Sequence, residues 1–366
     1  MNPILEKYAR LLVEYCLDIQ PGDRLLVRTT TLAEPLVREV FRQTIRRGGN
    51  MALDVQFEGQ NAIFMQEAEG DQLTFVSPLY REAMEHFEAY LYIMAPFNLR
   101  EDQEVNSTKV NLRQEALSGL QKIYSQRTAS RSLKRNLCLY PTSASAQNAS
   151  MSIDDYQHFV YKACKLFDQD PVTAWLQVRS HQQSIADHLN SCSEFHYKGP
   201  YADLTFSTKG RTWINSDGQT NMPSGEIYTS PVENSVNGTI EFSYPGVYMG
   251  HEVERVRLWV KDGYIEKWEA ARGKEFLDRI FSMKGTRRFG EAAIGTNYDI
   301  TRTTRNILFD EKIGGSVHLA IGQSYIQAGG KNESPVHWDM ITDMTNGGEI
   351  LANGEKIYEN GHFLIS

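Results

Sequence analysis

The chain has 366 residues, enough for about two globular domains at roughly 100–200 residues per domain. Hydrophobic residues make up 41% and charged residues 23%, as in ordinary globular proteins, which excludes wholesale disorder and a fibrous repeat. Acidic residues outnumber basic ones, 46 against 38, for a net charge of −8. This balance excludes a nucleic-acid-binding body, because neutralising phosphates requires a basic face.

The first half of the chain alternates helical and strand periods. Apolar residues recur at intervals of three and four between Ile4 and Tyr15, which predicts an amphipathic helix, and Gly22-Asp23 then turns the chain into an apolar strand. Further helices are predicted over 35–45, 78–87, 112–124 and 156–167. Strands are predicted over 25–27, 51–55, 90–95 and 137–140, and the Ser/Ala-rich stretch 143–152 is predicted to be a surface loop. Strands and helices in alternation predict a mostly parallel sheet covered on both faces.

No glycine-rich phosphate-binding motif follows any of these strands, so a dinucleotide site or a P-loop is not supported. This half is interpreted as a scaffold. After a helix predicted over 173–189, the pattern changes to short strands of period two, separated by turns such as Asp217-Gly218 and Asp262-Gly263. We therefore predict an α/β fold with two domains, an N-terminal α/β scaffold over 1–190 and a mixed, β-rich, metal-binding domain over 191–366.

The cysteines and the apolar runs indicate a cytoplasmic protein. The four cysteines are far apart and form no zinc-binding spacing, which is typical of buried, reduced thiols: Cys16, Cys138, Cys164 and Cys192. The longest apolar run, Ala89 to Phe97, falls short of the roughly 20 residues that a membrane-spanning helix needs. The charged N-terminus does not have the pattern of a signal peptide.

Residues able to bind metals are unusually dense between positions 221 and 339. In His337-Trp338-Asp339, residues two apart on a strand share a face, so the imidazole and the carboxylate can hold one or two cations. Taken alone, this short motif equally fits a histidine paired with a local aspartate for structure. The interpretation of this motif as a metal site depends on the other candidate ligands in the same part of the chain.

The other candidates lie beside glycines. Glu226 and Glu291 each follow a glycine, which allows close approach to a site, although each also fits a surface carboxylate near a turn. Glu311 and His318 flank Gly314-Gly315, where a surface glutamate and a core histidine are the alternative. Together, four carboxylates and two imidazoles suit two divalent ions, which can polarise a carbonyl and activate a shared water. This set therefore predicts hydrolysis.

The ordered motifs around these residues resemble one family along the length of the chain. They are Asn-Met-Pro-Ser-Gly-Glu226, Gly-Glu291-Ala-Ala-Ile-Gly-Thr-Asn, Asp-Glu311-Lys-Ile-Gly-Gly and Val-His337-Trp-Asp339. The chain resembles the thermophilic-type metalloaminopeptidases, the aminopeptidase T and aminopeptidase S family. This resemblance implies a dimeric, two-metal exopeptidase that releases N-terminal residues, leucine among them, from small peptides with a free N-terminus.

The resemblance also implies roles for individual residues. Glu226, Glu291, His318, His337 and Asp339 match the metal ligands, with Glu291 as the bridge. Glu311 matches a carboxylate at or beside the metals, and Tyr325 matches a tyrosine that donates to the oxyanion; Glu291 or Glu311 would carry the proton. Zinc is the first expectation for the metals, with cobalt, manganese or magnesium as others. The alternatives are a metal-dependent amide or ester hydrolase of another substrate class, and a non-catalytic metal-binding dimer.

Overall fold

The computed structural model describes residues 2–101 and 105–365, which form two compact units. The first unit runs to Thr173 and takes in Gly218–Met222, and the second comprises Ala174–Asp217 and the chain from Pro223 onward. The predicted domains 1–190 and 191–366 are continuous segments, whereas the first unit also includes Gly218–Met222. The domain bounds stay a prediction. Among the described residues, no helix is both long and apolar enough to cross a membrane.

A parallel sheet forms the centre of the first unit. Its five strands lie in the order β2-β1-β3-β4-β8 and are all paired in parallel. The strands are β1 (Arg24–Thr30), β2 (Asn50–Gln56), β3 (Ala89–Met94), β4 (Lys134–Leu139) and β8 (Asn221–Met222). Leu25, Leu26 and Val27 of the central strand β1 are all buried, as expected when helices cover both faces of a sheet. The predicted parallel sheet of the N-terminal half is confirmed.

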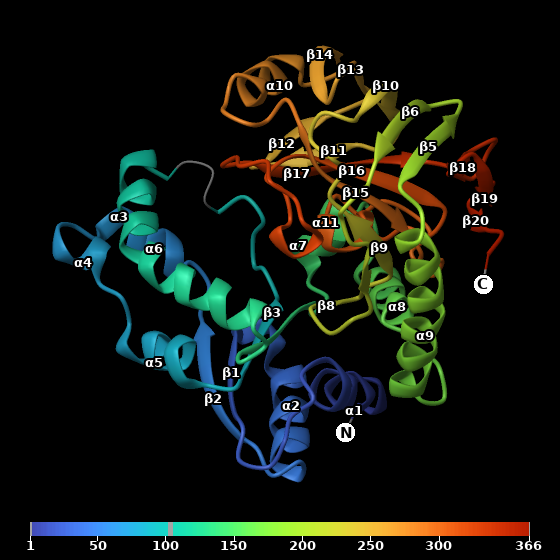
Figure 1. Cartoon of the computed structure of the whole chain (residues 1–366). Helices are drawn as coiled ribbons and strands as arrows, with labels where there is room; N and C mark the ends of the chain where they lie inside the picture. The colour runs from blue at the N-terminus through green and yellow to red at the C-terminus, as the bar shows by residue number, and fades with distance from the viewer. Residues whose placement is uncertain (1, 102–104, 366) are drawn as a thin grey trace. The chain divides into compact units, whose positions relative to one another are not determined.

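Helices cover this sheet on both sides. The helices of this part of the chain are α1 (Pro3–Arg10), which continues as a π-helix over Leu11–Cys16, α2 (Glu34–Arg46), α3 (Gln60–Glu67), α4 (Asp71–Thr74), α5 (Pro78–His86), α6 (Ser107–Ala129), α7 (Ser143–Asn148) and α8 (Ile153–Ala163). Figure 1 shows α2 on one side of β1 and β2, and α5 on the other. Ala83 of α5 and Leu120 of α6 pack with Leu26 of the sheet in one buried cluster. Helices α5 and α6 therefore cover that face of the sheet.

The prediction of a surface loop over 143–152 was wrong, because α7 begins there. The backbone N–H of Ser145 donates to the hydroxyl of Thr142, 3.3 Å away, which caps the helix. Ser145 and Ala146 are buried. A stretch rich in serine and alanine is typical of a loop, but here Thr142 caps a helix and the small side chains let that helix pack closely.

The second unit is built mainly from antiparallel sheets, which confirms the predicted β-rich half. Helix α9 (Pro171–Asn190) leads into it, and α10 (Lys274–Phe281) and α11 (Ile307–Asp310) interrupt the strands. One sheet has the order β14-β13-β10-β6-β5-β18-β19-β20, the second has the order β17-β16-β15-β9-β7, and β11 pairs with β12.

The bounds of these strands are as follows. The larger sheet contains β5 (Glu194–Gly199), β6 (Ala202–Ser207), β10 (Asn237–Phe242), β13 (Val256–Lys261), β14 (Tyr264–Glu269), β18 (Glu349–Ala352), β19 (Glu355–Glu359) and β20 (His362–Phe363). The smaller sheet contains β7 (Ile214–Ser216), β9 (Glu226–Thr229), β15 (Phe289–Gly295), β16 (Ser316–Gly322) and β17 (His337–Asp343), and the pair is β11 (Gly246–Tyr248) with β12 (His251–Val253).

The two large sheets of this unit share one hydrophobic core. Ile240 of the larger sheet and Ile227 and Leu319 of the smaller sheet belong to the same buried cluster. Side chains alternate along a strand, so residues next to these core positions on the smaller sheet point to its other face. That other face carries the candidate site.

Candidate metal centre

Five of the six predicted metal ligands lie on strands of the smaller sheet, between residues of the core. The core neighbours are Ile227 on β9, Ala292 on β15, Val317 and Leu319 on β16, and Trp338 and Met340 on β17. The ligand candidates alternate with them and share the opposite face: Glu226, Glu291, His318, His337 and Asp339. Because successive side chains on a strand point to opposite faces, the same strands supply the core on one face and the candidate ligands on the other.

Glu291 reaches this face through a β-bulge. The pairing of β15 with β16 shifts register between Phe289 and Glu291. Phe289 belongs to the core, so without the shift Glu291, two residues later, would point into the core as well. A Cβ on Gly290 would lie 2.1 Å from the backbone oxygen of Gln323, which is too close for any side chain. Glycine is therefore required where the bulge turns Glu291 toward the site.

Small residues separate the candidate ligands across the sheet. Ala320 on β16 pairs with Glu291 on one side and with Asp339 on the other. Ala293 on β15 pairs with His318. Because a methyl group is short, the longer carboxylates and imidazoles on either side can lean together above it. The sheet therefore brings their polar atoms close to one another.

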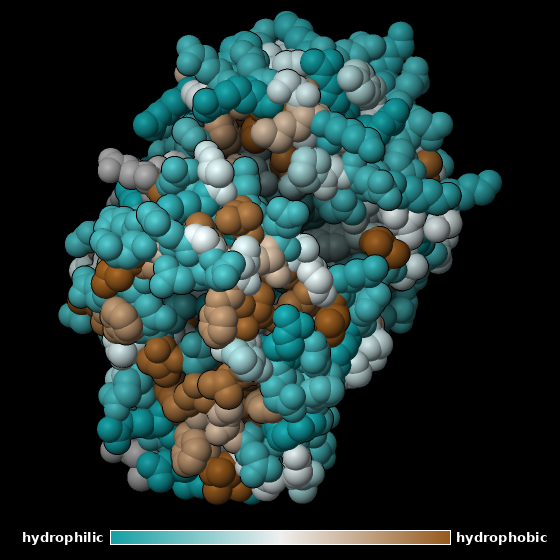
Figure 2. All heavy atoms as spheres, turned by 90° about the vertical axis from the view of Figure 1, so that its left-hand side faces the viewer, coloured by the Kyte–Doolittle hydropathy of each residue, from teal (hydrophilic) through white to brown (hydrophobic). Residues whose placement is uncertain are grey.

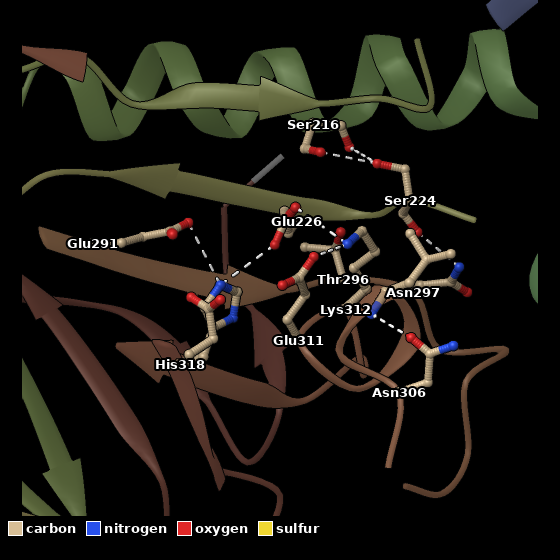
Figure 3. Close-up of polar contacts among 12 residues, drawn as sticks. Ser216, Ser224, Glu226, Glu291, Thr296, Asn297, Asn306, Glu311, Lys312 and His318 are labelled. Carbon is tan, nitrogen blue, oxygen red and sulfur yellow. Dashed lines mark hydrogen bonds and ion pairs between the residues drawn. The ribbon is translucent and has the colours of Figure 1, made fainter. Parts of the chain in front are cut away.

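The polar atoms form two groups of three residues. Glu226, Glu291 and His318 place one ligand atom each within 4.8 Å of one another, and Glu291, His337 and Asp339 do the same. Nε2 of His318 lies 3.4 Å from Oε2 of Glu226 and 3.6 Å from Oε1 of Glu291, as Figure 3 shows. Glu291 belongs to both groups, which is the arrangement that a bridging carboxylate requires.

His337 is oriented by the protein backbone. Its Nδ1 lies 2.8 Å from the backbone oxygen of Gln323, which assigns the proton to Nδ1. Its Nε2 then faces two carboxylates, 3.1 Å from Oε2 of Glu291 and 3.6 Å from Oδ1 of Asp339. A backbone acceptor on one ring nitrogen is the usual support of a metal-binding histidine.

The donor set fits divalent metal ions. In the described part of the chain, several buried site atoms find no hydrogen-bond partner: Nδ1 and Nε2 of His318, Nε2 of His337 and Oδ1 of Asp339. Buried polar atoms are nearly always hydrogen-bonded, so a cluster without partners needs another explanation. Imidazole nitrogens and carboxylate oxygens are ligands that zinc, cobalt and manganese accept. A bound cation would satisfy Nε2 of each histidine and Oδ1 of Asp339.

The protonation of the site follows from its crowded charges. Burial opposes the protonated form of His318, yet the carboxylates of Glu291 and Glu226 raise its pKa to about 9. Burial likewise opposes protonation of His337, but Asp339 and Glu291 raise its pKa to about 12. Burial works against ionisation of Asp339, and His337 nevertheless holds the pKa of Asp339 at about 2. Without a metal, protons therefore occupy the imidazole positions that metals would need.

Glu311 lies beside the two groups and belongs to neither of them. It follows α11 and contacts the ammonium group of Lys312 through Oε1. Nζ of Lys312 also lies 3.6 Å from Oε1 of Glu226, so one lysine holds two carboxylates, as Figure 3 shows. Burial raises the pKa of Glu311, and the charges of Glu226 and Asp339 add to this although Lys312 opposes it.

Tyr325 lies on the His337 side of the site. Its ring centre is 5.0 Å from the ring of His337 and 5.0 Å from the ring of Tyr228. The charge of Glu291, together with burial, raises the pKa of Tyr325 well above its usual value. The phenol therefore keeps its proton and remains a hydrogen-bond donor.

Sequence reasoning missed Lys312. Its side chain is completely buried, and burial disfavours its charge, but Glu226 and Glu311 raise the pKa of Lys312 above its usual value. The sequence signal was its place directly after Glu311 in the segment Asp-Glu-Lys-Ile-Gly-Gly. Lys312 therefore adds one fixed positive charge to the four carboxylates predicted for the site.

Comparisons with known proteins cover nearly the whole chain. The family model described as thermophilic metalloprotease (M29) matches residues 1–363. Aminopeptidase PepS of Streptococcus thermophilus is 27% identical over 415 residues, covering 99% of this chain and 98% of the relative. Aminopeptidase 2 of Geobacillus stearothermophilus is 27% identical over 406 residues, covering 98% and 97%.

A solved structure has the same fold. The structure titled wild-type AmpT from Thermus thermophilus matches with a TM-score of 0.85 at 21% identity, over 99% of each chain. Aminopeptidase T of Thermus thermophilus is also 28% identical in sequence over 233 residues, covering 55% of each chain. The similarity therefore spans both compact units.

Proposed function

Because the chain belongs to the family of thermophilic metalloproteases (M29), whose relatives above are named aminopeptidases, we propose that it is a two-metal aminopeptidase. It would hydrolyse the N-terminal peptide bond of small peptides, with leucine-type residues among its substrates. The observation that carries the proposal is Glu291, shared by two groups that each contain one histidine. One metal would be held by Glu226, Glu291 and His318, and the other by Glu291, His337 and Asp339.

Bound metals would polarise the scissile carbonyl and lower the pKa of a water molecule. The chain's own residues arrange the rest of the site. Both oxygens of Glu291 face histidines, Oε1 toward His318 and Oε2 toward His337. Glu291 would therefore serve as a metal ligand and not as the group that carries the proton. Gln323 fixes the ring of His337 through its backbone oxygen.

Glu311 is the better candidate for carrying the proton. Its Oε1 contacts Lys312, and it lies outside both ligand groups, which leaves its other oxygen for the water and the leaving amine. Burial raises its pKa, and an acid–base group works best when its pKa is near the working pH. Glu311 would take a proton from the attacking water and pass it to the nitrogen of the leaving group.

Tyr325 would donate its phenolic proton to the oxygen of the tetrahedral intermediate. Its raised pKa supports this role, since a neutral phenol can donate where negative charge develops. Its ring packs against His337, close to the proposed reaction centre.

A dimer and a cytoplasmic location are also part of the proposal. Figure 2 shows apolar side chains gathered on the face that it presents. Exposed large hydrophobic residues of the first unit include Phe41 and Ile45 on α2, and Leu53 and Val55 on β2. An exposed apolar area of this kind supports a contact with a second copy. The buried thiols of Cys138 and Cys164 support a reducing compartment.

The function is tested by stripping the protein with a chelator and reloading it separately with zinc, cobalt, manganese or magnesium. Leucyl-p-nitroanilide and Leu-Gly-Gly should be cleaved after reloading and not before. N-acetyl-leucyl-p-nitroanilide, which has no free amine, should stay intact. Metal analysis should find two ions per chain. Metal binding without cleavage of any peptide in a dipeptide panel would favour another hydrolase substrate or a structural metal site.

A further inference from the structure

The first unit contains a pocket of about 540 Å³ with polar and apolar walls, far from any candidate metal ligand in sequence. It lies between the sheet and the helices α3, α5 and α6, which Figure 1 shows on one side of β1 and β2. Its walls include Arg28 of β1, Asp54 of β2 and Arg113 of α6. The volume is in the range of small-molecule sites.

The charges in this pocket are not explained by packing. A parallel sheet covered by helices normally presents apolar side chains beneath them, yet Arg28 and Asp54 are direct neighbours on β1 and β2 there. Their side chains are 32% and 39% exposed, and Nε of Arg28 lies 3.4 Å from Oδ2 of Asp54. Asp54 is the one carboxylate among the described residues that line the pocket, against two arginines. Among the lining residues that the structure describes, positive charges therefore exceed negative ones by one.

Aromatic rings and backbone oxygens hold the two guanidinium groups in place. Arg28 lies over the ring of Tyr80, 5.2 Å from its centre, and Arg113 lies over Phe64 at 5.3 Å. Nη1 of Arg113 donates to the backbone oxygens of Leu73 and Phe75. Within 2–101 and 105–365, these are the hydrogen bonds of Arg113, so its Nε and Nη2 remain for a ligand. Burial lowers the pKa of Arg113, and the charge of Arg28 adds to this, so the two groups are close enough to repel each other.

We propose that this pocket binds a small carboxylate with an apolar body. Two fixed guanidinium groups match the planar, bidentate geometry of a carboxylate. Phe64, Leu117 and Leu120 offer apolar surface in the same pocket for the rest of the ligand. A bound carboxylate would offset the excess positive charge that Asp54 leaves.

The test is isothermal titration of the full-length, metal-loaded protein with 3-phenylpropionate. The matched neutral probe is 3-phenylpropanamide, which keeps the apolar body and lacks the charge. We expect the carboxylate to bind at least roughly ten-fold more tightly than the amide, because charge-assisted hydrogen bonds are the stronger ones. Sodium phosphate at the same ionic strength should not displace 3-phenylpropionate from the pocket.

Variants assign the binding to this pocket. Arg28→Gln and Arg113→Gln should each weaken binding roughly ten-fold or more, and Leu117→Trp should weaken it by occupying part of the apolar wall while both arginines remain. Arg38→Gln, at a 73% exposed arginine on α2, is the matched control and should bind as the parent does. Cleavage of leucyl-p-nitroanilide should be unchanged in all four variants, which separates this site from the metal centre.

Three results would overturn the proposal: equal binding of the amide, unchanged affinity in both arginine variants, or loss of binding when the protein is stripped of metal. The last would mean that the carboxylate binds the metals. Circular dichroism and thermal unfolding of each variant check the fold, and Leu117→Trp keeps the test valid if an arginine variant unfolds.

Discussion

The charged side chains of the candidate metal centre are buried much more deeply than those of the pocket in the first unit. In the second unit, the side chains of Glu291, His318 and Lys312 are 4%, 1% and 0% exposed. In the first unit, Arg28 and Asp54 of the pocket are 32% and 39% exposed. The first set is almost removed from water, whereas the second keeps about a third of its side-chain surface in contact with water.

The difference in burial determines how large an effect we expect when a charged side chain is substituted. Charges removed from water interact strongly, and each depends on its partners, because an uncompensated buried charge costs several kcal/mol. Charges that stay in contact with water are screened, and a pair of them contributes about 0–1 kcal/mol. Substitutions of the buried charged groups at the candidate metal centre should therefore have large effects, and substitutions of partly exposed charged groups in the first unit should have small ones.

The largest effect should come from Glu291→Gln. The amide keeps the shape but cannot supply two anionic oxygens to His318 and His337 and to metals between them. We expect kcat for leucyl-p-nitroanilide to fall by on the order of 10³ or more. Elemental analysis should show fewer than two metal ions per chain.

The control for this variant is Glu266→Gln, at an exposed position on β14 of the same unit. It should leave both activity and metal content unchanged. Retention of more than a tenth of the parent activity in Glu291→Gln would contradict the bridging role.

Tyr325→Phe should have the next largest effect, because it removes the proposed donor to the oxyanion and leaves the ring packed against His337. We expect a loss of roughly 10²–10³ in kcat with little change in KM. Metal content should be unaffected, which distinguishes this residue from the ligands. A variant that loses affinity for substrate and keeps its kcat would assign Tyr325 to substrate binding instead.

Lys312→Met tests whether burial makes this charge essential. The change leaves Glu226 and Glu311 buried beside each other without their shared cation. The metal-free protein should lose about 3–5 kcal/mol of unfolding free energy, measured by urea titration. Metal should restore part of the loss, because it supplies positive charge to the same carboxylates. Lys267→Met, at a 60% exposed lysine paired with Glu269, should cost less than about 1 kcal/mol.

The sequence predicted the ligand candidates but not the lysine that supports them. Glu226, Glu291 and His337 stand in motifs with recognisable spacing, so the resemblance could identify them. A lysine after a glutamate in a loop is normally solvated, and only the packing around α11 buries Lys312. The same limit applies to the pocket of the first unit, where Arg28 and Arg113 are far apart in sequence and meet through the fold.

The fold shows a similar division. Alternating periods predicted the parallel sheet and its helices, because local patterns follow which face is buried. The β-bulge at Gly290 could not be predicted, since it depends on how β15 pairs with β16. The bulge reverses the face of Glu291, so strand periodicity alone would place this ligand in the core.

Gly290→Ala tests that bulge and should have an intermediate effect. The new Cβ would lie 2.1 Å from the backbone oxygen of Gln323, the same atom that holds His337. We expect a loss of about 1–3 kcal/mol in stability, together with weaker metal binding. Gly119→Ala, on helix α6 with nothing within 4 Å of the new Cβ, is the control and should not destabilise the protein. A stable variant with full metal content would mean that the sheet adjusts without moving Gln323.

The smallest effect should come from a charge pair of the first unit, Arg24 and Glu88, whose side chains are 42% and 36% exposed. The hydrogen bond from Arg24 lowers the pKa of Glu88 from 4.5 to about 2, although some burial opposes this. A carboxylate with a lowered pKa stabilises the folded state above its unfolded pKa, and that contribution is lost as the pH falls from about 4.5 toward 2. Because water screens the pair, Glu88→Gln should cost less than about 1 kcal/mol at neutral pH. The difference in unfolding free energy between this variant and the parent, measured by urea unfolding, should shrink below about pH 4 and in high salt.

The control is Glu67→Gln, at an exposed glutamate at the end of α3. Its unfolding free energy relative to the parent should not depend on pH or salt in this way. A cost of several kcal/mol for Glu88→Gln that persists at low pH would mean that partly exposed charges in this unit are as tightly coupled as the buried ones, and the contrast between the two units would fail.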